Sequence, residues 1–233
     1  IGSPSGLSPD NRKERMIDLY IDADSILHQC AAPQDERLYR CLHVPSGRVK
    51  DWKDKASVTK FIDEWVAGIP QKRSVDDFSV EQVLHYTGSL KAAQIAFAGK
   101  VEAIKEAVSR HSGFGKTFVC IGGPHNFRKS VYAKWVEYKA QRVAPKPTVF
   151  DELARWVRHN YGDQCLVSEN EETDDVVVRA AFAGNIVACM DKDIIANCVG
   201  YLYNYNKDEW KFNSDEDRWM KFCQQMLEGD TSD

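Results

Sequence analysis

The sequence has no long hydrophobic run, and this absence limits what the protein can be. No window of about 18 residues is both apolar and free of charge, so we expect no transmembrane helix and no membrane partner. The first residues, IGSPSGLSPDNRKER, also lack the apolar segment of a secretory signal. We interpret residues 1–15 as a tag or flexible leader and residues 16–233 as one domain in the cytoplasm.

The sequence also lacks paired cysteines and an excess of positive charge. Its seven cysteines are odd in number and never stand in CxxC spacing, which argues against a zinc site or a disulfide framework. Most lie in apolar runs such as FVCIG and IVACM, where a free thiol acts as a small hydrophobic side chain in a reducing cytosol. The net charge of −4 does not suggest a protein that coats nucleic acid, but the charges are strongly segregated along the chain.

Short apolar strands alternate with amphipathic helices in this chain. This pattern predicts an α/β protein, a three-layer α/β/α sandwich around a mostly parallel central sheet. Ser57 is the expected N-cap of its helix. The expected strands are 16–23, 117–123, 164–168 and 185–190, the hairpins lie around 45–47 and over 201–212, and the helices are 57–66, 79–109 (with a break near 87–89), 147–161, 173–184 and 214–229.

Acidic residues follow the predicted strands at the point where each strand ends. In parallel sheets ligands bind at the carboxyl ends of the strands, so we expect these groups to converge on one pocket. Carboxylate oxygens suit hard divalent cations, and two Mg²⁺ or Mn²⁺ ions are commonly used for phosphodiester hydrolysis. The groups are Asp22 and Asp24, then Glu172, Asp174 and Asp175, then Asp191 and Asp193, and finally Asp230 and Asp233.

Each acidic group has an ordinary explanation when it is taken alone. The acidic residues that open the helix at 173 favour the positive end of the helix dipole. The sequence DKD after a strand is also typical of a turn. Asp24 could cap the next helix while Asp22 carries the chemistry. Only the joint occurrence of the groups favours a metal site.

Basic and aromatic residues alternate in the stretch NFRKSVYAKWVEYKAQRVAPKP, residues 126–147. Basic groups bind phosphates and aromatic rings stack on unpaired bases, a combination typical of single-strand binding. The alternative is an amphipathic helix with a solvated basic face and Trp135 in the core. Because the stretch follows the second strand directly, we expect it to lie over the acidic pocket as a basic helical arch.

The order of these motifs resembles that of a known family. IDADS, FRK…YKAQR, EETDD, MDKD and EGDTSD are similar to the motifs of the flap endonuclease and 5′→3′ exonuclease family of PIN-like nucleases, with the compact bacteriophage 5′-exonucleases and the nuclease domain of bacterial DNA polymerase I as the closest members. The resemblance spans about 16–233. It implies a two-metal enzyme that hydrolyses DNA near a 5′ end or flap, as an exonuclease or endonuclease, and leaves 5′-phosphates. We expect a monomer without an obligate protein partner, active in the bacterial host cytosol if phage-encoded.

The resemblance also assigns roles to individual residues. Lys139 and Arg142 would engage the scissile phosphate, Tyr138 would stack on the terminal base, and Asp174 would be both catalytic and a metal ligand. The arch or clamp would be the segment 126–147. The implied metal ligands are Asp22, Glu172, Asp174, Asp175, Asp191, Asp193, Asp230 and Asp233, and the implied DNA contacts are Arg128, Lys129, Lys134, Tyr138, Lys139, Arg142 and Lys146.

The chain departs from the family pattern in two places. Many members carry an aspartate a few residues before FR, where this sequence has Gly122 and Gly123, so one expected ligand is missing. His125 is a candidate to compensate, although an exposed loop histidine is the simpler interpretation. Members also continue beyond GDTSD into a helix-turn-helix-type module that binds duplex DNA, so we expect weak duplex binding from this sequence.

Other functions are compatible with parts of the pattern. A haloacid dehalogenase-type phosphatase also begins with a strand followed by DxD, and Asp22 would then be the nucleophile and Asp24 the general acid. That reading leaves EETDD and the basic stretch unexplained. A catalytically weak or inactive PIN-like DNA-binding protein is the second alternative. RNA is a further possible substrate, since none of these motifs detects a 2′-hydroxyl.

Overall fold

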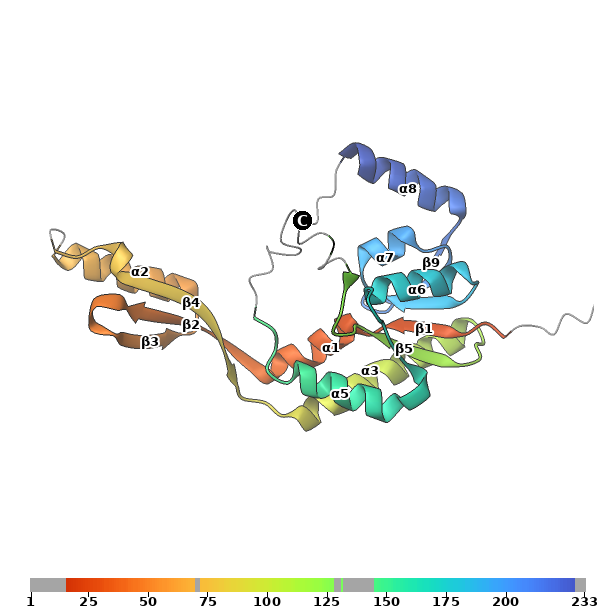
Figure 1. Ribbon diagram of the computed structural model, residues 1–233, viewed down its shortest axis with the longest axis horizontal. Helices are drawn as coiled ribbons and strands as arrows, with labels where there is room; N and C mark the ends of the chain where they lie inside the picture. The colour runs from red at the N-terminus through yellow and green to blue at the C-terminus, as the bar shows by residue number, and fades with distance from the viewer. Residues whose placement is uncertain (1–15, 70–71, 128–130, 132–144, 229–233) are drawn as a thin grey trace, which may run out of the picture.

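The computed structural model describes residues 16–69, 72–127, 131 and 145–228 (Figure 1). Within these ranges no helix combines the length and the apolar character that crossing a membrane requires. Strands and helices alternate along the chain, which confirms the predicted α/β class.

A six-stranded sheet with the order β6-β5-β1-β7-β8-β9 forms the centre of the molecule. Five of these strands run parallel, and only β9 pairs antiparallel with its neighbour β8. This confirms the mostly parallel sheet expected from the sequence. The strands are β1 Leu19–Asp22, β5 Thr117–Ile121, β6 Cys165–Val167, β7 Ile186–Cys189, β8 Gly200–Asn204 and β9 Glu209–Asn213.

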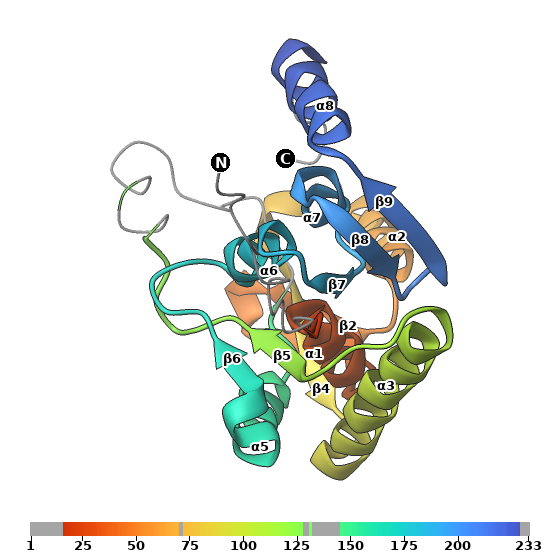
Figure 2. The ribbon, with the colours of Figure 1, turned by 90° about the vertical axis from the view of Figure 1, so that its right-hand side faces the viewer.

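Helices cover both faces of this sheet, an arrangement compatible with a three-layer sandwich (Figures 1 and 2). On one face, α1 (Asp24–Ala31), α3 (Leu90–His111) and α5 (Phe150–Tyr161) contact one another. The other face carries α6 (Thr173–Phe182) and α7 (Lys192–Asn197). The last helix, α8 (Asp215–Glu228), contacts α7 and β9.

The apolar strands are buried because both of their faces are covered. In β1, Leu19 and Ile21 belong to the core cluster shared with α1, α3 and α5, while Tyr20 packs against the cluster under α6 and α7. In β7, Ile186 faces the first cluster and Val187 the second. Successive side chains of a strand point to opposite faces, so a strand between two helical layers needs apolar residues at every position.

A second, three-stranded antiparallel sheet extends away from the central one (Figure 1). Its order is β3-β2-β4, and α2 covers one of its faces with a small core of Cys41, Val58 and Ile62. The hairpin expected around 45–47 is confirmed as the β2–β3 connection. The elements are β2 Asp35–His43, β3 Arg48–Trp52, α2 Lys55–Gly68 and β4 Phe78–Tyr86, with short 3₁₀ turns at Ala32–Gln34, Val44–Ser46, Val75–Asp77 and Gly162–Gln164.

The expected helix over 79–109 is wrong in its first part. Residues Phe78–Tyr86 form β4, which pairs with β2 along its whole length, and the helix α3 begins only at Leu90. Ser89 caps that helix, its hydroxyl oxygen accepting a hydrogen bond from the backbone N–H of Ala92 at 3.0 Å. The expected cap at Ser57 is also wrong, because Asp54 holds that position.

The core under α3 gives a test of the fold. Phe97 is fully buried and meets the Trp156 and Tyr161 rings of α5 edge to face. We expect Phe97→Ala to lower the free energy of unfolding by about 3–5 kcal/mol, because the cavity it leaves cannot collapse completely. Urea denaturation measures this. The control is Ile95→Ala on the same helix, where the side chain is 63% exposed, and an equal loss in both variants would contradict the assignment of the core.

Candidate active site

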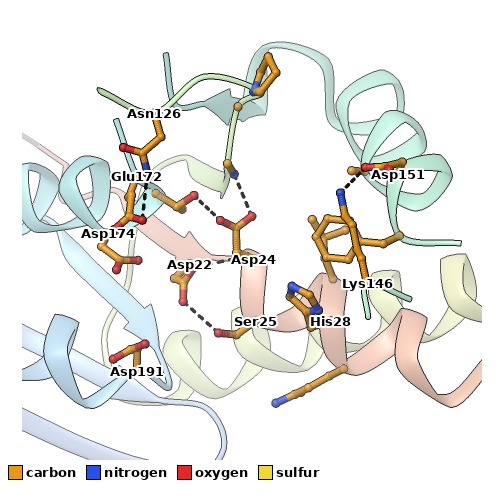
Figure 3. A pocket seen from close by; sticks show the side chains of 18 of the residues that line it. Asp22, Asp24, Ser25, His28, Asn126, Lys146, Asp151, Glu172, Asp174 and Asp191 are labelled. Atoms are coloured by element: carbon orange, nitrogen blue, oxygen red, sulfur yellow. Dashed lines mark hydrogen bonds and ion pairs between the residues drawn. The ribbon is translucent and has the colours of Figure 1, made fainter. Parts of the chain in front are cut away.

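The carboxyl end of β1 lies at the point where the order of the strands reverses. From β1 the chain adds β5 and then β6 on one side, and then crosses to add β7, β8 and β9 on the other. In open α/β sheets, ligands bind in the crevice outside the strand ends at such a point. Here a cavity of about 830 Å³ opens at this place (Figure 3).

Carboxylates from separate strand ends line this cavity. Asp22 ends β1, Glu172 and Asp174 lie at the start of α6, and Asp191 follows β7. The structure therefore brings these four of the predicted metal ligands to one place, as Figure 3 shows. Asp24 and Glu171 line the same cavity, and neither was among the predicted ligands.

Asp22 is the most deeply buried of these acids, with 2% of its surface exposed. Burial raises the pKa of its carboxyl from 3.8 to about 8, with further contributions from the nearby charges of Asp24, Asp174 and Asp191. Its two oxygens accept long hydrogen bonds from the Asp24 backbone N–H (3.3 Å) and the Ser25 hydroxyl (3.5 Å). These donors are too weak to offset the burial of a charge, so Asp22 holds a proton at neutral pH unless a cation is present.

Asp24 links the end of β5 to the start of α6, and the sequence did not predict this link. It is the first residue of α1, yet its side chain does not cap that helix. One carboxylate oxygen accepts a hydrogen bond from the backbone N–H of Gly122 (2.8 Å), and the other from the hydroxyl of Thr173 (2.6 Å). Asp24 thus joins the ends of β1 and β5 to the start of α6. The suggestion that it serves only as a helix cap is wrong.

The two glycines after β5 are explained by close contacts. A Cβ atom on Gly122 would lie 2.9 Å from a carboxylate oxygen of Asp24. A Cβ atom on Gly123 would lie only 2.1 Å from the backbone oxygen of Ser168. An aspartate at Gly123 would collide with the backbone of Ser168, whereas one at Gly122 would have to displace the carboxylate of Asp24. Asp24 itself provides a carboxylate beside Gly122. His125 is exposed and does not line the cavity.

Two predicted ligands lie apart from the main cavity. Asp175 and Asp193 line a second hollow of about 400 Å³ between α6, α7 and α8. Asp174 lines both hollows, so it stands between the two groups. The Asp175 carboxylate also accepts the Glu172 backbone N–H at 3.2 Å, which caps α6.

Hydrogen bonds fix the other carboxylates of the main cavity. Glu172 accepts a hydrogen bond from the side-chain amide of Asn126 at 3.0 Å. Asp191 caps α7, accepting the backbone N–H of Asp193 at 2.8 Å. Glu171 forms a bidentate pair with Arg179. Glu171, Glu172 and Asp191 are therefore each held in place by a hydrogen-bond donor.

The donor set fits hard divalent cations. Among the described residues, no three His, Cys, Asp or Glu side chains are arranged to hold one ion. The cavity nevertheless offers six carboxylates and no thiol or imidazole on the acidic side, which suits Mg²⁺ or Mn²⁺ rather than zinc. Burial, and after it the charges of Asp24, Asp174 and Asp191, raise the pKa of Asp22, and a cation beside these carboxylates would oppose both effects.

Most of the predicted nucleic-acid contacts lie outside the described residues. This applies to Arg128, Lys129, Lys134, Tyr138, Lys139 and Arg142, and to the predicted ligands Asp230 and Asp233. Lys146 is described and lines the cavity. Its ammonium pairs with Asp151 at 2.5 Å and lies 4.4 Å from the centre of the Phe150 ring.

Apart from Lys146, the side chains on the wall opposite the carboxylates were not predicted. His28 of α1 packs its ring on Phe150 with 4.4 Å between the centres, and Arg155 and Arg158 of α5 line the same side. Arginines on an amphipathic helix look like a solvated face in the sequence, so no local signal distinguishes them. No model of a known protein family matches this chain, and no curated protein is similar enough to count as a relative.

The buried acid at the end of β1 makes stability depend on pH. The Asp22 pKa is higher in the folded than in the unfolded chain, so folding loses stability as pH rises from about 4 to about 8. In EDTA at pH 8 we expect Asp22→Asn to raise the free energy of unfolding by more than about 1 kcal/mol, and Tm by about 2–4 °C or more.

Thermal melts at pH 4 and pH 8 check this expectation. At pH 4 most of the gain should be lost, because Asp22 is then neutral in the folded chain and close to half protonated in the unfolded chain, where its pKa is 3.8. The exposed Asp163 provides the control substitution Asp163→Asn, which should show no such pH-dependent gain. A gain for Asp22→Asn that is the same at both pH values would contradict the raised pKa.

The close approach of Gly123 to Ser168 gives a second test of the site. We expect Gly123→Ala to lower the free energy of unfolding by about 1–3 kcal/mol, because the new methyl group forces the ends of β5 and β6 apart. The matched control is Gly113→Ala, where no atom lies within 4 Å of the added Cβ. Urea denaturation of both variants measures the loss of stability. If Gly123→Ala and Gly113→Ala were equally stable, the ends of β5 and β6 would be free to separate.

Proposed function

We propose that this protein is a metal-dependent nuclease that hydrolyses phosphodiester bonds near the 5′ ends or flaps of DNA. The observation that carries the proposal is the convergence of carboxylates from β1, β7 and the start of α6 on one cavity. The order of the sequence motifs, which resembles the 5′-nuclease family, supplies the substrate and the 5′ polarity. Mg²⁺ or Mn²⁺ is the cofactor in this proposal.

The ions, when bound, supply electrostatic stabilisation of the attacking and leaving oxygens. The protein's own contribution is to hold the carboxylates in place. Asp22 ionises as a ligand in the presence of a cation, because the opposite charge offsets the cost of its burial. Asp174, which lines both hollows, would serve ions in each of them. Lys139 and Arg142 would orient the scissile phosphate from the basic stretch.

The phosphatase alternative has some support, because Asp22 and Asp24 line the same cavity two residues apart. That reaction needs Asp24 to donate a proton to the leaving group. Both oxygens of Asp24 instead accept hydrogen bonds, from Gly122 and from Thr173. This arrangement favours the nuclease. Beryllium fluoride trapping at Asp22 would favour the phosphatase.

The central experiment uses DNA oligonucleotides that are single-stranded, blunt duplex or 5′-flapped, each labelled at one end. We expect Mg²⁺ or Mn²⁺ to support release of short 5′-phosphorylated products, and EDTA to abolish it. Asp174→Ala should reduce the rate at least about 100-fold, because charge stabilisation of this kind contributes several kcal/mol to the barrier. Matched RNA oligonucleotides establish the preferred sugar.

The control for Asp174→Ala is Glu169→Ala, which removes an exposed carboxylate of the same acidic run that does not line the cavity. It should leave the rate within about twofold of the unaltered protein. DNA binding without cleavage in either metal would reject the enzyme and favour the non-catalytic alternative. Equal losses in both variants would show that the acidic run acts only through its overall charge.

A further inference from the structure

Charge is divided between two walls of the main cavity. The carboxylates of β1, β7 and α6 occupy one wall, as described above. The opposite wall carries Lys146, Arg155 and Arg158 with a single acid, Asp151, which is paired with Lys146. Figure 3 shows Asp22, Asp174 and Asp191 on one side and His28, Lys146 and Asp151 on the other.

The two arginines face the cavity because of their spacing on α5. Asp151, Arg155 and Arg158 are separated by four and three residues, which places them on one side of a helix. Leu153 and Val157 of the same helix are fully buried and anchor the opposite side in the core. The arginines are therefore held on a rigid element and not on a loop.

Of the two arginines on α5, Arg158 is the one that lies next to the acidic wall. Arg158 donates a hydrogen bond to the backbone oxygen of Gly122 at 3.4 Å, and the N–H of the same glycine bonds to Asp24. Arg155 lies one turn farther along α5, about 4.5 Å along the helix axis. Its partner within the helix is Glu152, at 4.0 Å and well exposed, a contact that solvent weakens and that an incoming phosphate can replace.

We propose that Arg155 and Arg158 form a phosphate-binding subsite for the nucleic-acid strand, next to the carboxylates that would surround the cut. A nucleic-acid strand leaving the acidic wall passes Arg158 first. A guanidinium group can bind two phosphate oxygens with two parallel N–H donors. The subsite consists of two residues of α5, outside the sequence range 126–147, and it holds the strand on the α5 side of the cavity. This inference rests on the proposed nuclease function for its substrate.

Binding measured in EDTA tests the subsite without cleavage. The change is Arg155→Gln with Arg158→Gln, which removes two charges but keeps the side-chain stems. Fluorescence anisotropy with a labelled single strand gives the slope of log K against log salt. Each lost phosphate contact should make this slope shallower by about 0.7, so we expect about 1.4 for the pair. The control is Arg110→Gln with Lys116→Gln. It removes two exposed charges near the amino-terminal ends of the parallel strands, on the opposite side of the sheet from the cavity.

Neutral methylphosphonates placed one at a time along the strand locate the contact. At one or two positions they should weaken binding by the unaltered protein and by the control, but not further weaken binding by the arginine variant. An unchanged salt slope, or the same methylphosphonate profile in all three proteins, would overturn the subsite, as would a failure of the unaltered protein to bind. If binding responds as expected and no metal supports cleavage, the subsite stands and the nuclease function fails.

Discussion

The main constraint on this molecule is the burial of one carboxyl group, Asp22, among other carboxylates at the end of the central strand. An isolated buried charge is costly, and neighbouring charges of the same sign add to the cost. Burial, followed by the neighbouring charges, raises the pKa of Asp22 to about 8, so without a cation the carboxyl avoids this cost by staying protonated. A bound cation would offer the alternative, in which Asp22 would be ionised and the neighbouring carboxylates would be further ligands.

The surrounding fold keeps these acids from moving apart. β1 is flanked by β5 and β7 and covered by helices on both faces, so its end cannot shift without disturbing both core clusters. Two hydrogen bonds hold the ends of β1, β5 and β6 together: the backbone N–H of Gly122 donates to Asp24, and that of Gly123 donates to Ser168. The two glycines after β5 are thus part of the packing of the site, since a Cβ atom would meet the Asp24 carboxylate at Gly122 and the backbone oxygen of Ser168 at Gly123.

The same cavity separates charge in a way that suits a polyanion. An acidic wall alone would repel a nucleic-acid strand, whereas a cationic wall alone would bind it without acting on it. Here Arg158 lies within two hydrogen bonds of Asp24, through Gly122, so the two walls meet at the end of β5. In the proposed function, a strand bound across this junction would present one phosphate to the acids while α5 would hold the neighbouring phosphate. Positioning of this kind would contribute to the proposed catalysis by orienting the reacting groups.

The sequence alone was enough to predict the class of fold and half of the candidate site. Buried strands are apolar at every position, and the acids that follow them must lie at one edge of a parallel sheet, so Asp22, Asp174 and Asp191 could be placed together in advance. The sequence was misleading where the secondary structure of a segment depends on pairing with a strand far away in the chain. Residues 78–86 have apolar side chains that fit a helix, and only pairing with β2 makes them a strand.

The tertiary structure also decided the role of Asp24, the need for glycine at 123, and the side of α5 that faces the cavity. Each of these depends on contacts between residues more than 20 positions apart in the chain, which local periodicity does not contain. The pattern of apolar residues along a strand shows where the strand ends and which residues follow it, because this pattern lies within a few neighbouring residues. Which side chains then meet across the cavity is set by the packing of helices on the sheet, and that is a property of the whole chain.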